Sequence, residues 1–228
     1  MAQQKYQRRI KHPVGKKEGK QPTLPIKEER LLKRVLDYLW GRYLSAKSDI
    51  KKYQAYRDYM IVLIGVNTAF RAEDLLQLRV VDVIKGYITI KENKTGKVQN
   101  YRMNKQLHNE ILKYIETFKI DNYLFMGQKK KETRNGVTQD VIYPITRQNC
   151  DATMFKRIKE ACGIDFKFAL HSLRKTFGYM FILHGGNMLT LQQMYMHESV
   201  EITLRYVMWD MHDVEKTRNE YFIGGIRK

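Results

Sequence analysis

The sequence predicts a mainly helical α+β domain with a small three-stranded antiparallel sheet. Apolar residues recur every three or four positions along most of the chain, which is the period of an amphipathic helix. After about residue 80 this period changes, and short β-branched segments at 81–84, 87–90 and 98–103 are separated by turn residues. The two turns are Lys85-Gly86 and Lys94-Thr95-Gly96-Lys97.

Helices are expected on both sides of this sheet. Before it, the pattern predicts a helix whose buried face runs from Leu31 to Leu44, a second at about 51–66 and a third that starts near Arg71. Residues 119–145 are mixed, with two short extended pieces around a basic loop. The remaining helices are expected at 105–118, from the cap Thr146 to Gly163 (inner face Cys150, Met154, Phe155, Ile158 and Ala161), and at 171–184, 189–196, 199–209 and 213–222.

The composition is strongly basic. The 228 residues include 42 Lys and Arg against 24 Asp and Glu, which gives a formal net charge of +18. Such a chain binds polyanions by releasing their counterions, and a nucleic acid is the usual polyanion. A membrane-surface protein or a merely soluble basic protein would show the same balance, so charge alone does not decide between them.

Cysteine usage and hydropathy predict a cytoplasmic protein. Cys150 and Cys162 lie twelve apart in one expected helix, which does not suit a bridge between them, and no CxxC spacing indicates zinc. The longest apolar stretch, from Met60 to Val66, is too short to span a membrane. The basic N-terminus lacks the apolar segment of a signal peptide.

Two basic segments are candidates for nucleic-acid contact. Residues 1–22 carry seven Lys or Arg and one Glu among prolines and glycines, and we interpret them as a flexible basic arm before a domain at 23–228. The alternative is a cloning or processing remnant. The second segment is the loop with Lys129, Lys130, Lys131 and Arg134, for which the alternative is a solvated hairpin.

The candidate catalytic residues fit phosphodiester cleavage without a metal or another cofactor. Two guanidiniums neutralise the charge of a five-coordinate phosphorus transition state with forked hydrogen bonds that a single ammonium cannot copy. A tyrosine hydroxyl, with a reference pKa of ~10, needs cationic neighbours and a proton acceptor to act as a nucleophile. The departing 5′ oxygen needs a proton donor, and a lysine on a turn suits that role. The residues are Arg71, Lys94, His171, Arg174, His197 and Tyr206.

Taken singly, each of these residues has an ordinary interpretation. Arg71 suits a surface charge at a helix start, Lys94 a hairpin turn, and His197 a helix cap. His171 and Arg174 are three apart, so they also suit one solvated helix face.

Their order and intervals together resemble the tyrosine recombinase (phage integrase) family. The segment NTAFRAEDLLQLRVVDV resembles the family's first arginine box, and ITIKENKTGK its strand-turn-strand lysine. HSLRKTFGYMFILHGG resembles the His-x-x-Arg box, and LQQMYMHESVEITLRYV the final box with its histidine and tyrosine. The resemblance covers roughly residues 23–210 and implies the family's catalytic-domain fold.

The resemblance also implies a role for each residue. Arg71 and Arg174 would clamp the non-bridging phosphate oxygens, with Asp74 orienting Arg71. His171 and His197 would hydrogen-bond the same phosphate, and His171 would shuttle the tyrosine proton. Lys94 would protonate the leaving oxygen while Tyr206 forms a 3′-phosphotyrosine. The implied protein is a site-specific recombinase of a phage or mobile element.

The resemblance extends to partners and surroundings. The implied partner is double-stranded DNA, on which the protein would assemble as a tetramer, whereas the free protein would be a monomer or a weak oligomer. The implied location is the nucleoid of a bacterium or a phage-infected host. In the family the segment after the tyrosine often docks on a neighbouring subunit, and the alternative is a helix that packs on its own domain.

Three features depart from the family pattern. Asp74 stands where the family has Glu, and Met196 stands where it has Gly, so that a Cβ there would shift the helix that presents His197. No separate core-binding domain is expected before residue 23. Two alternative functions stay open: a non-catalytic DNA-binding regulator on the same fold, and a type IB topoisomerase-like enzyme.

Overall fold

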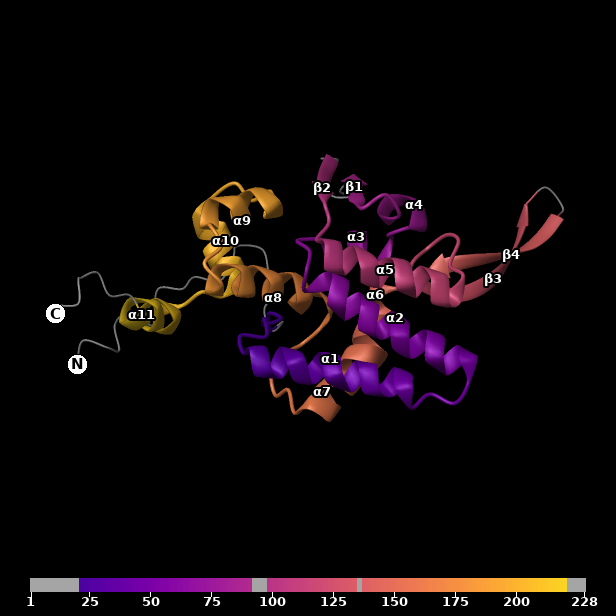
Figure 1. Cartoon of the computed structure of the whole chain (residues 1–228), viewed down its shortest axis with the longest axis horizontal. Helices are drawn as coiled ribbons and strands as arrows, with labels where there is room; N and C mark the ends of the chain where they lie inside the picture. Colours follow the sequence, from indigo (N-terminus) through magenta and orange to yellow (C-terminus); the bar gives the residue numbers. More distant parts are fainter. Residues whose placement is uncertain (1–20, 92–97, 135–136, 221–228) are drawn as a thin grey trace.

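The computed structural model describes residues 21–91, 98–134 and 137–220. The predicted helices are present in the expected order, joined by two β-hairpins (Figure 1). The elements are α1 (Glu29–Leu44), α2 (Asp49–Gly65), α3 (Ala72–Leu76), α4 (Val80–Val83), β1 (Tyr87–Lys91), β2 (Val98–Arg102), α5 (Lys105–Phe118), β3 (Met126–Arg134), β4 (Val137–Pro144), α6 (Arg147–Asn149), the π-helical segment η3 (Cys150–Phe155), α7 (Lys156–Cys162), α8 (Leu170–Leu183), α9 (Met188–Tyr195), α10 (Val200–Val207) and α11 (Met211–Glu220).

Two hydrophobic clusters hold these elements together. The larger one surrounds α2, whose Tyr56, Met60 and Ile61 are fully or almost fully buried, and includes residues of α1, α5, α7 and α8. The smaller one joins α8, α9 and α10 and is centred on Leu191, Tyr195 and Val207. In Figure 1, α9, α10 and α11 lie at one end of the molecule, and the hairpin of β3 and β4 extends from the other end.

The prediction of a three-stranded sheet is wrong for one of its strands. β1 and β2 pair as an antiparallel two-stranded sheet, but the segment expected as the first strand forms the short helix α4. A segment of four residues is too short to separate a strand from a helical turn by periodicity. The helical turn is favoured by Asp82, whose side chain accepts a 2.8 Å hydrogen bond from the backbone N–H of Arg79.

The expected basic loop is also wrong in its secondary structure. Lys129, Lys130 and Lys131 lie within β3, which pairs antiparallel with β4 from Met126 to Arg134. Lys129 forms a 2.7 Å ion pair with Asp140 on β4. The lysines are therefore displayed along a paired ribbon rather than on an irregular loop.

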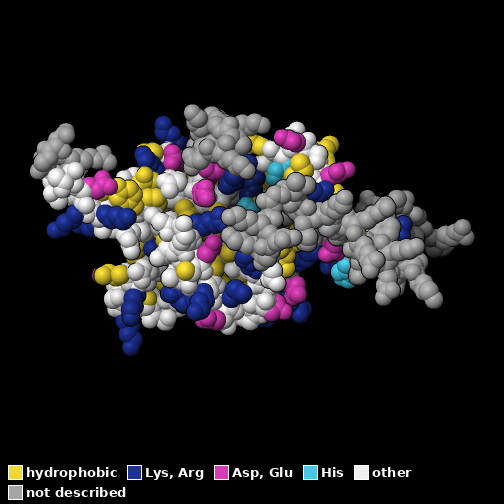
Figure 2. All heavy atoms as spheres, turned by 180° about the vertical axis from the view of Figure 1, so that it is seen from behind, with side chains coloured by type: hydrophobic (Ala, Val, Ile, Leu, Met, Phe, Trp, Pro, Cys, Tyr) yellow, Lys and Arg dark blue, Asp and Glu magenta, His cyan; other side chains and the backbone are white. Residues whose placement is uncertain are grey.

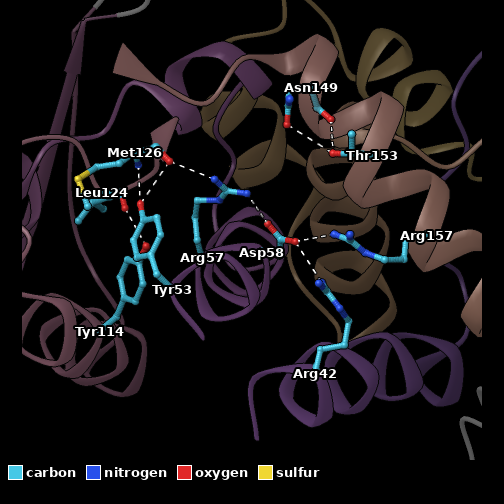
Figure 3. A network of polar contacts seen from close by, with 10 residues as sticks. All are labelled: Arg42, Tyr53, Arg57, Asp58, Tyr114, Leu124, Met126, Asn149, Thr153 and Arg157. Carbon is cyan, nitrogen blue, oxygen red and sulfur yellow. Dashed lines mark hydrogen bonds and ion pairs between the residues drawn. The ribbon is translucent and has the colours of Figure 1, made fainter. Parts of the chain in front are cut away.

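The base of this hairpin is fixed to α2. The Tyr53 hydroxyl accepts a 2.7 Å hydrogen bond from the N–H of Met126 (Figure 3). Nη1 of Arg57 donates a 3.1 Å bond to the carbonyl of Met126. Arg57 also pairs with the buried carboxylate of Asp58, which accepts further bonds from Arg42 on α1 and Arg157 on α7. One carboxylate thus connects three helices with the start of the hairpin.

The helix that begins at the cap Thr146 contains a π-helical segment. The Thr146 hydroxyl accepts a bond from Asn149 N–H as expected, and Gly163 ends the helix in the left-handed region with φ 65°. A π-turn accommodates one extra residue, so the inner face shifts, and Cys162 is buried while Ala161 is exposed. Both cysteines are free.

Several expectations fall outside the described residues. These are residues 1–20 of the basic arm, the turn at 92–97 and residues 221–228 at the C-terminus. Within the described residues, no helix is both long and apolar enough to cross a membrane.

Candidate active site

The first turn of α8 places His171 and Arg174 on one side of the helix. The N–H of Leu170 donates a 2.8 Å hydrogen bond to the side chain of Asp151, which fixes the start of α8 against the π-helical segment η3. The Ser172 hydroxyl accepts a 3.1 Å bond from Ala169 N–H and closes the first turn. Residues three apart lie on the same face of a helix, so the side chains of His171 and Arg174 point toward the same region.

Arg174 is buried and joins the segments around the site. Its Nη1 donates to the carbonyl of Ala69, two residues before Arg71, and its Nη2 donates a 3.0 Å bond to the carbonyl of Tyr195. The guanidinium carbon lies 4.3 Å from the ring centroid of Tyr195 and 5.9 Å from that of Tyr206. This one side chain therefore holds the loop before α3 and the end of α9 next to α8.

Tyr206 faces His171 across the site. The Tyr206 hydroxyl lies 2.8 Å from Nε2 of His171, and the two rings meet edge to face with centroids 5.5 Å apart. Tyr206 is carried by α10, whose start is capped by the Ser199 hydroxyl accepting from Ile202 N–H. The side chain of Tyr206 is partly buried, and its hydroxyl is held by the contact with His171.

The ring of His197 also contacts Tyr206. Its ring centroid is 5.2 Å from that of Tyr206, and its Nδ1 is 3.1 Å from the Thr203 hydroxyl. The preceding residue, Met196, ends α9 in the left-handed region with φ 53° and ψ 39°. This backbone conformation favours glycine. Met196, which stands where the family has Gly, is therefore at a position where a side chain is poorly tolerated.

Two arginines influence the ionisation of the tyrosine. Burial raises the pKa of Tyr206 to about 12, while the positive charges of Arg174 and Arg71 act in the opposite direction. At neutral pH the phenol is therefore protonated. His171 is the imidazole in contact with it.

The remaining predicted residues are placed as follows. Arg71 immediately precedes α3, close enough to Tyr206 for its charge to lower the phenol pKa. Asp74 is buried within α3. Lys94 lies outside the described residues. The structure thus brings together the side chains of Arg71, His171, Arg174, His197 and Tyr206.

Sequence reasoning missed three residues of this arrangement. Tyr195 donates its hydroxyl to the carbonyl of Arg174 and supports the guanidinium with its ring, and Thr203 contacts His197. Lys175 is buried, with its Nζ 5.4 Å from the Tyr206 ring centroid. Tyr195 lies four residues after the buried Leu191, a spacing that signals a core position but not a contact with an arginine.

Residues 42–212 match the model of the phage integrase family. The chain belongs to the phage integrase family. Membership of this family supports DNA recombination and integration as the general class of activity. The chain is 32% identical over 188 residues to the probable integrase/recombinase YoeC of Bacillus subtilis (strain 168), an alignment that covers 81% of this chain and 95% of the relative.

Solved structures of a recombinase and of a transposon integrase show the same fold. The crystal structure of XerA recombinase superposes with a TM-score of 0.62 at 20% identity, covering 88% of this chain and 66% of the other. The Tn1549 transposon integrase, solved in complex with transposon right end DNA, gives a TM-score of 0.57 at 18% identity, covering 89% of this chain and 67% of the other. The fold is therefore that of a tyrosine-recombinase catalytic domain, with a two-stranded sheet in place of the expected three strands.

Proposed function

We propose that this protein is a site-specific DNA recombinase that cleaves and rejoins DNA through a 3′-phosphotyrosine at Tyr206. The observation that carries the proposal is the contact between the Tyr206 hydroxyl and Nε2 of His171, 2.8 Å apart and beside Arg174. A nucleophile, a proton acceptor and a buried cation meet at this point. These are the groups that in-line attack on a phosphodiester requires.

The cleavage step assigns one event to each group. The Tyr206 oxygen bonds to phosphorus as its proton moves to Nε2 of His171, and the bond from phosphorus to the 5′ oxygen breaks. Arg71 and Arg174 neutralise the charge that develops on the non-bridging oxygens, and Asp74 orients Arg71. His197 donates a hydrogen bond to the same phosphate, held in orientation by Thr203.

The leaving oxygen takes its proton from Lys94. Transfer from a positioned lysine is worth typically ~10²–10⁴-fold in rate. Rejoining is the reverse step: a 5′-hydroxyl attacks the phosphotyrosine, and the phenol regains its proton. The covalent bond conserves the energy of the cleaved linkage, so the cycle needs no cofactor.

The proposed partner is double-stranded DNA, as in the solved complex of the similar Tn1549 integrase. Strand exchange between two sites requires a tyrosine for each exchanged strand, so we propose a tetramer on paired sites. A net charge of +18 suits binding to the phosphate backbone.

The test is covalent trapping on a nicked suicide duplex, whose short cleaved strand diffuses away and prevents rejoining. Wild type is expected to form a protein–DNA adduct that maps by mass to Tyr206. Tyr206→Phe is expected to bind the duplex and form none. Tyr87→Phe, which alters an exposed tyrosine on β1, is the matched control and should react like wild type.

The trapping assay separates a regulator from an enzyme, and a plasmid-relaxation assay beside a two-site recombination assay separates the two kinds of enzyme. A non-catalytic regulator would bind without an adduct in wild type, which would end the proposal. A topoisomerase-like enzyme would form the adduct and relax a supercoiled plasmid, but it would not exchange strands between two sites.

A further part of the proposal concerns the hairpin of β3 and β4 as a DNA contact. Figure 2 shows Lys and Arg side chains along the hairpin, which projects at the left in that view. Lys130 and Lys131 are exposed on β3, and Lys130 also lines a polar groove of about 1030 Å³ that reaches Glu73 on α3 and Arg147 on α6. The groove thus connects the hairpin with the helix that follows Arg71.

The salt dependence of binding tests this contact. Each phosphate neutralised contributes a slope of about −0.9 to the plot of log affinity against log salt concentration. The double variant Lys130→Gln/Lys131→Gln should therefore reduce the slope by ~1.8 if both lysines contact phosphates. The control Lys33→Gln/Lys156→Gln alters exposed lysines on α1 and α7 and should leave it unchanged. An unchanged slope in the hairpin variant would remove Lys130 and Lys131 from the DNA contact.

A further inference from the structure

Residues 21–28, here called the N-terminal strap, form neither helix nor strand and are hydrogen-bonded to α8 and to the segment just before it. The N–H of Leu24 donates a 3.0 Å hydrogen bond to the carbonyl of Lys167, just before α8. The N–H of Ile26, whose side chain is fully buried, donates a 2.9 Å bond to the Thr176 hydroxyl on α8. The strap is therefore fixed to the helix that carries His171 and Arg174.

Lys27 connects the strap with the chain that follows Tyr206. Its Nζ lies 2.7 Å from Oδ2 of Asp213 and 3.0 Å from Oδ2 of Asp210. It also lies 5.0 Å from the ring centroid of Tyr179, a residue of α8. The Tyr179 hydroxyl donates a 2.7 Å hydrogen bond to Oδ1 of Asp213. Three segments far apart in the sequence thus converge on one carboxylate.

Asp210 and Asp213 also form the N-terminal cap of α11. Oδ1 of Asp210 accepts bonds from the N–H groups of His212 and Asp213, and Oδ2 of Asp213 accepts a 2.9 Å bond from the N–H of Asp210. This cap begins four residues after Tyr206. Any displacement of the cap is transmitted to the end of α10 through a short connection.

The charge of Asp213 depends on this arrangement. Burial by itself raises the pKa of Asp213, but hydrogen bonds from Lys27, the Asp210 N–H and Tyr179 lower it below its usual value. Asp213 is only 5% exposed, so Lys27 is the cation that neutralises a buried carboxylate. The loss of such a partner leaves an uncompensated buried charge, which is strongly destabilising, and we expect the cap to move in response.

We propose that Lys27 is a positioning residue for Tyr206, acting through Asp213. It holds the chain after the nucleophile against α8, so that the phenol stays beside His171. A second connection supports the same role for the strap: Nζ of Lys175 donates a 2.6 Å bond to the carbonyl of Thr23 while lying next to the Tyr206 ring. This inference rests on the proposed function of Tyr206.

The cleavage rate constant at saturating DNA, measured beside the equilibrium DNA affinity, tests the proposal. Lys27→Met should lower the rate constant by ~10–100-fold because sub-ångström to ångström misplacement of a reacting group costs that much. Its DNA affinity should stay that of wild type. Lys27→Arg, which keeps the charge, should restore most of the rate. Lys33→Met, which breaks an exposed Lys–Asp pair on α1, should cleave like wild type.

A wild-type rate in Lys27→Met, or equal losses of rate and affinity, would overturn the proposal. Asp213→Asn provides the same test from the other partner if Lys27→Met does not fold, since the amide oxygen still caps α11.

Hydrogen exchange separates a failure of this inference from a failure of the recombinase proposal. In Lys27→Met, amides of α10 and α11 should exchange faster while those of α1 and α2 stay unchanged, and Lys33→Met should show neither effect. If wild type forms no adduct, the recombinase proposal fails, but the exchange result still decides whether Lys27 orders α10. Unchanged exchange in α10 would overturn the role of Lys27 whatever the activity.

Discussion

The hydroxyl of Tyr206 and Nε2 of His171 lie 2.8 Å apart, although 35 residues separate them in the sequence. The contact links α10 with the first turn of α8, and in the proposed mechanism it gives the phenol its proton acceptor. Because burial raises the pKa of Tyr206 to about 12, almost none of the phenol is ionised at neutral pH. The acceptor is therefore expected to matter most at low and neutral pH.

The first prediction concerns the pH dependence of cleavage in His171→Gln. At pH 7 the variant should cleave about 10²–10⁴-fold more slowly than wild type, since it lacks the proton acceptor. Its rate should then rise about tenfold per pH unit toward the Tyr206 pKa, because only the phenolate reacts. Wild type should show a smaller rise. Single-turnover cleavage of a nicked duplex from pH 6.5 to 9 measures this, and a flat profile in the variant would contradict the proton-transfer role.

The second prediction concerns Gly178 on α8, where the hydroxyl of Tyr195 and the side chain of Val207 approach the helix backbone. A Cβ at this position would lie 2.6 Å from Cγ1 of Val207 and would also overlap the Tyr195 hydroxyl. Gly178→Ala should therefore destabilise the protein by ~1–3 kcal/mol and slow cleavage, because α10 and Tyr206 must shift.

Urea unfolding and adduct formation measure the two effects of Gly178→Ala. The matched control is Gly41→Ala within α1, where a Cβ meets nothing within 4 Å. It should stabilise the protein by ~1 kcal/mol through helix propensity. Equal stability changes in the two variants would show that α8 has room for a methyl group next to Val207.

The sequence motifs pointed to the side chains of the candidate site that the structure brings together, but not to the residues that support them. Arg174 and Tyr206 stand in segments whose order and intervals are typical of the family, so they were found without knowledge of their contacts. Tyr195 and Lys27 belong to no motif, and their roles arise from packing between α8, α9 and the strap. The strand expected at 81–84 failed for a local reason, since Asp82 caps a helical turn there.

The third prediction concerns Asp58, which is 1% exposed and contacts Arg42, Arg57 and Arg157 (Figure 3). Asp58→Asn removes the only negative charge from this contact set and leaves three guanidiniums facing a neutral amide. The expected loss is ~3–5 kcal/mol of unfolding free energy. Asp37→Asn, in an exposed pair with Lys33, should change it by less than ~1 kcal/mol. A small effect in Asp58→Asn would mean that water compensates the three arginines.

The fourth prediction concerns Met196, the residue before His197. Its φ of 53° and ψ of 39° are left-handed, as are the φ of 62° and ψ of 37° at Met208, which ends α10. A side chain in this region costs roughly 1–2 kcal/mol. Glycine removes this cost but loses more conformational entropy on folding, which offsets part of the gain. Met196→Gly should therefore stabilise the protein by ~1 kcal/mol.

Met196→Ala separates the backbone effect from the loss of the methionine side chain. Alanine keeps the Cβ and the left-handed strain, so this variant should show no gain in the urea unfolding free energy. Met208→Gly should gain by a similar amount to Met196→Gly, since the same backbone conformation ends both helices. If alanine and glycine stabilise equally at position 196, the strain lies in the methionine side chain and not in the backbone that presents His197.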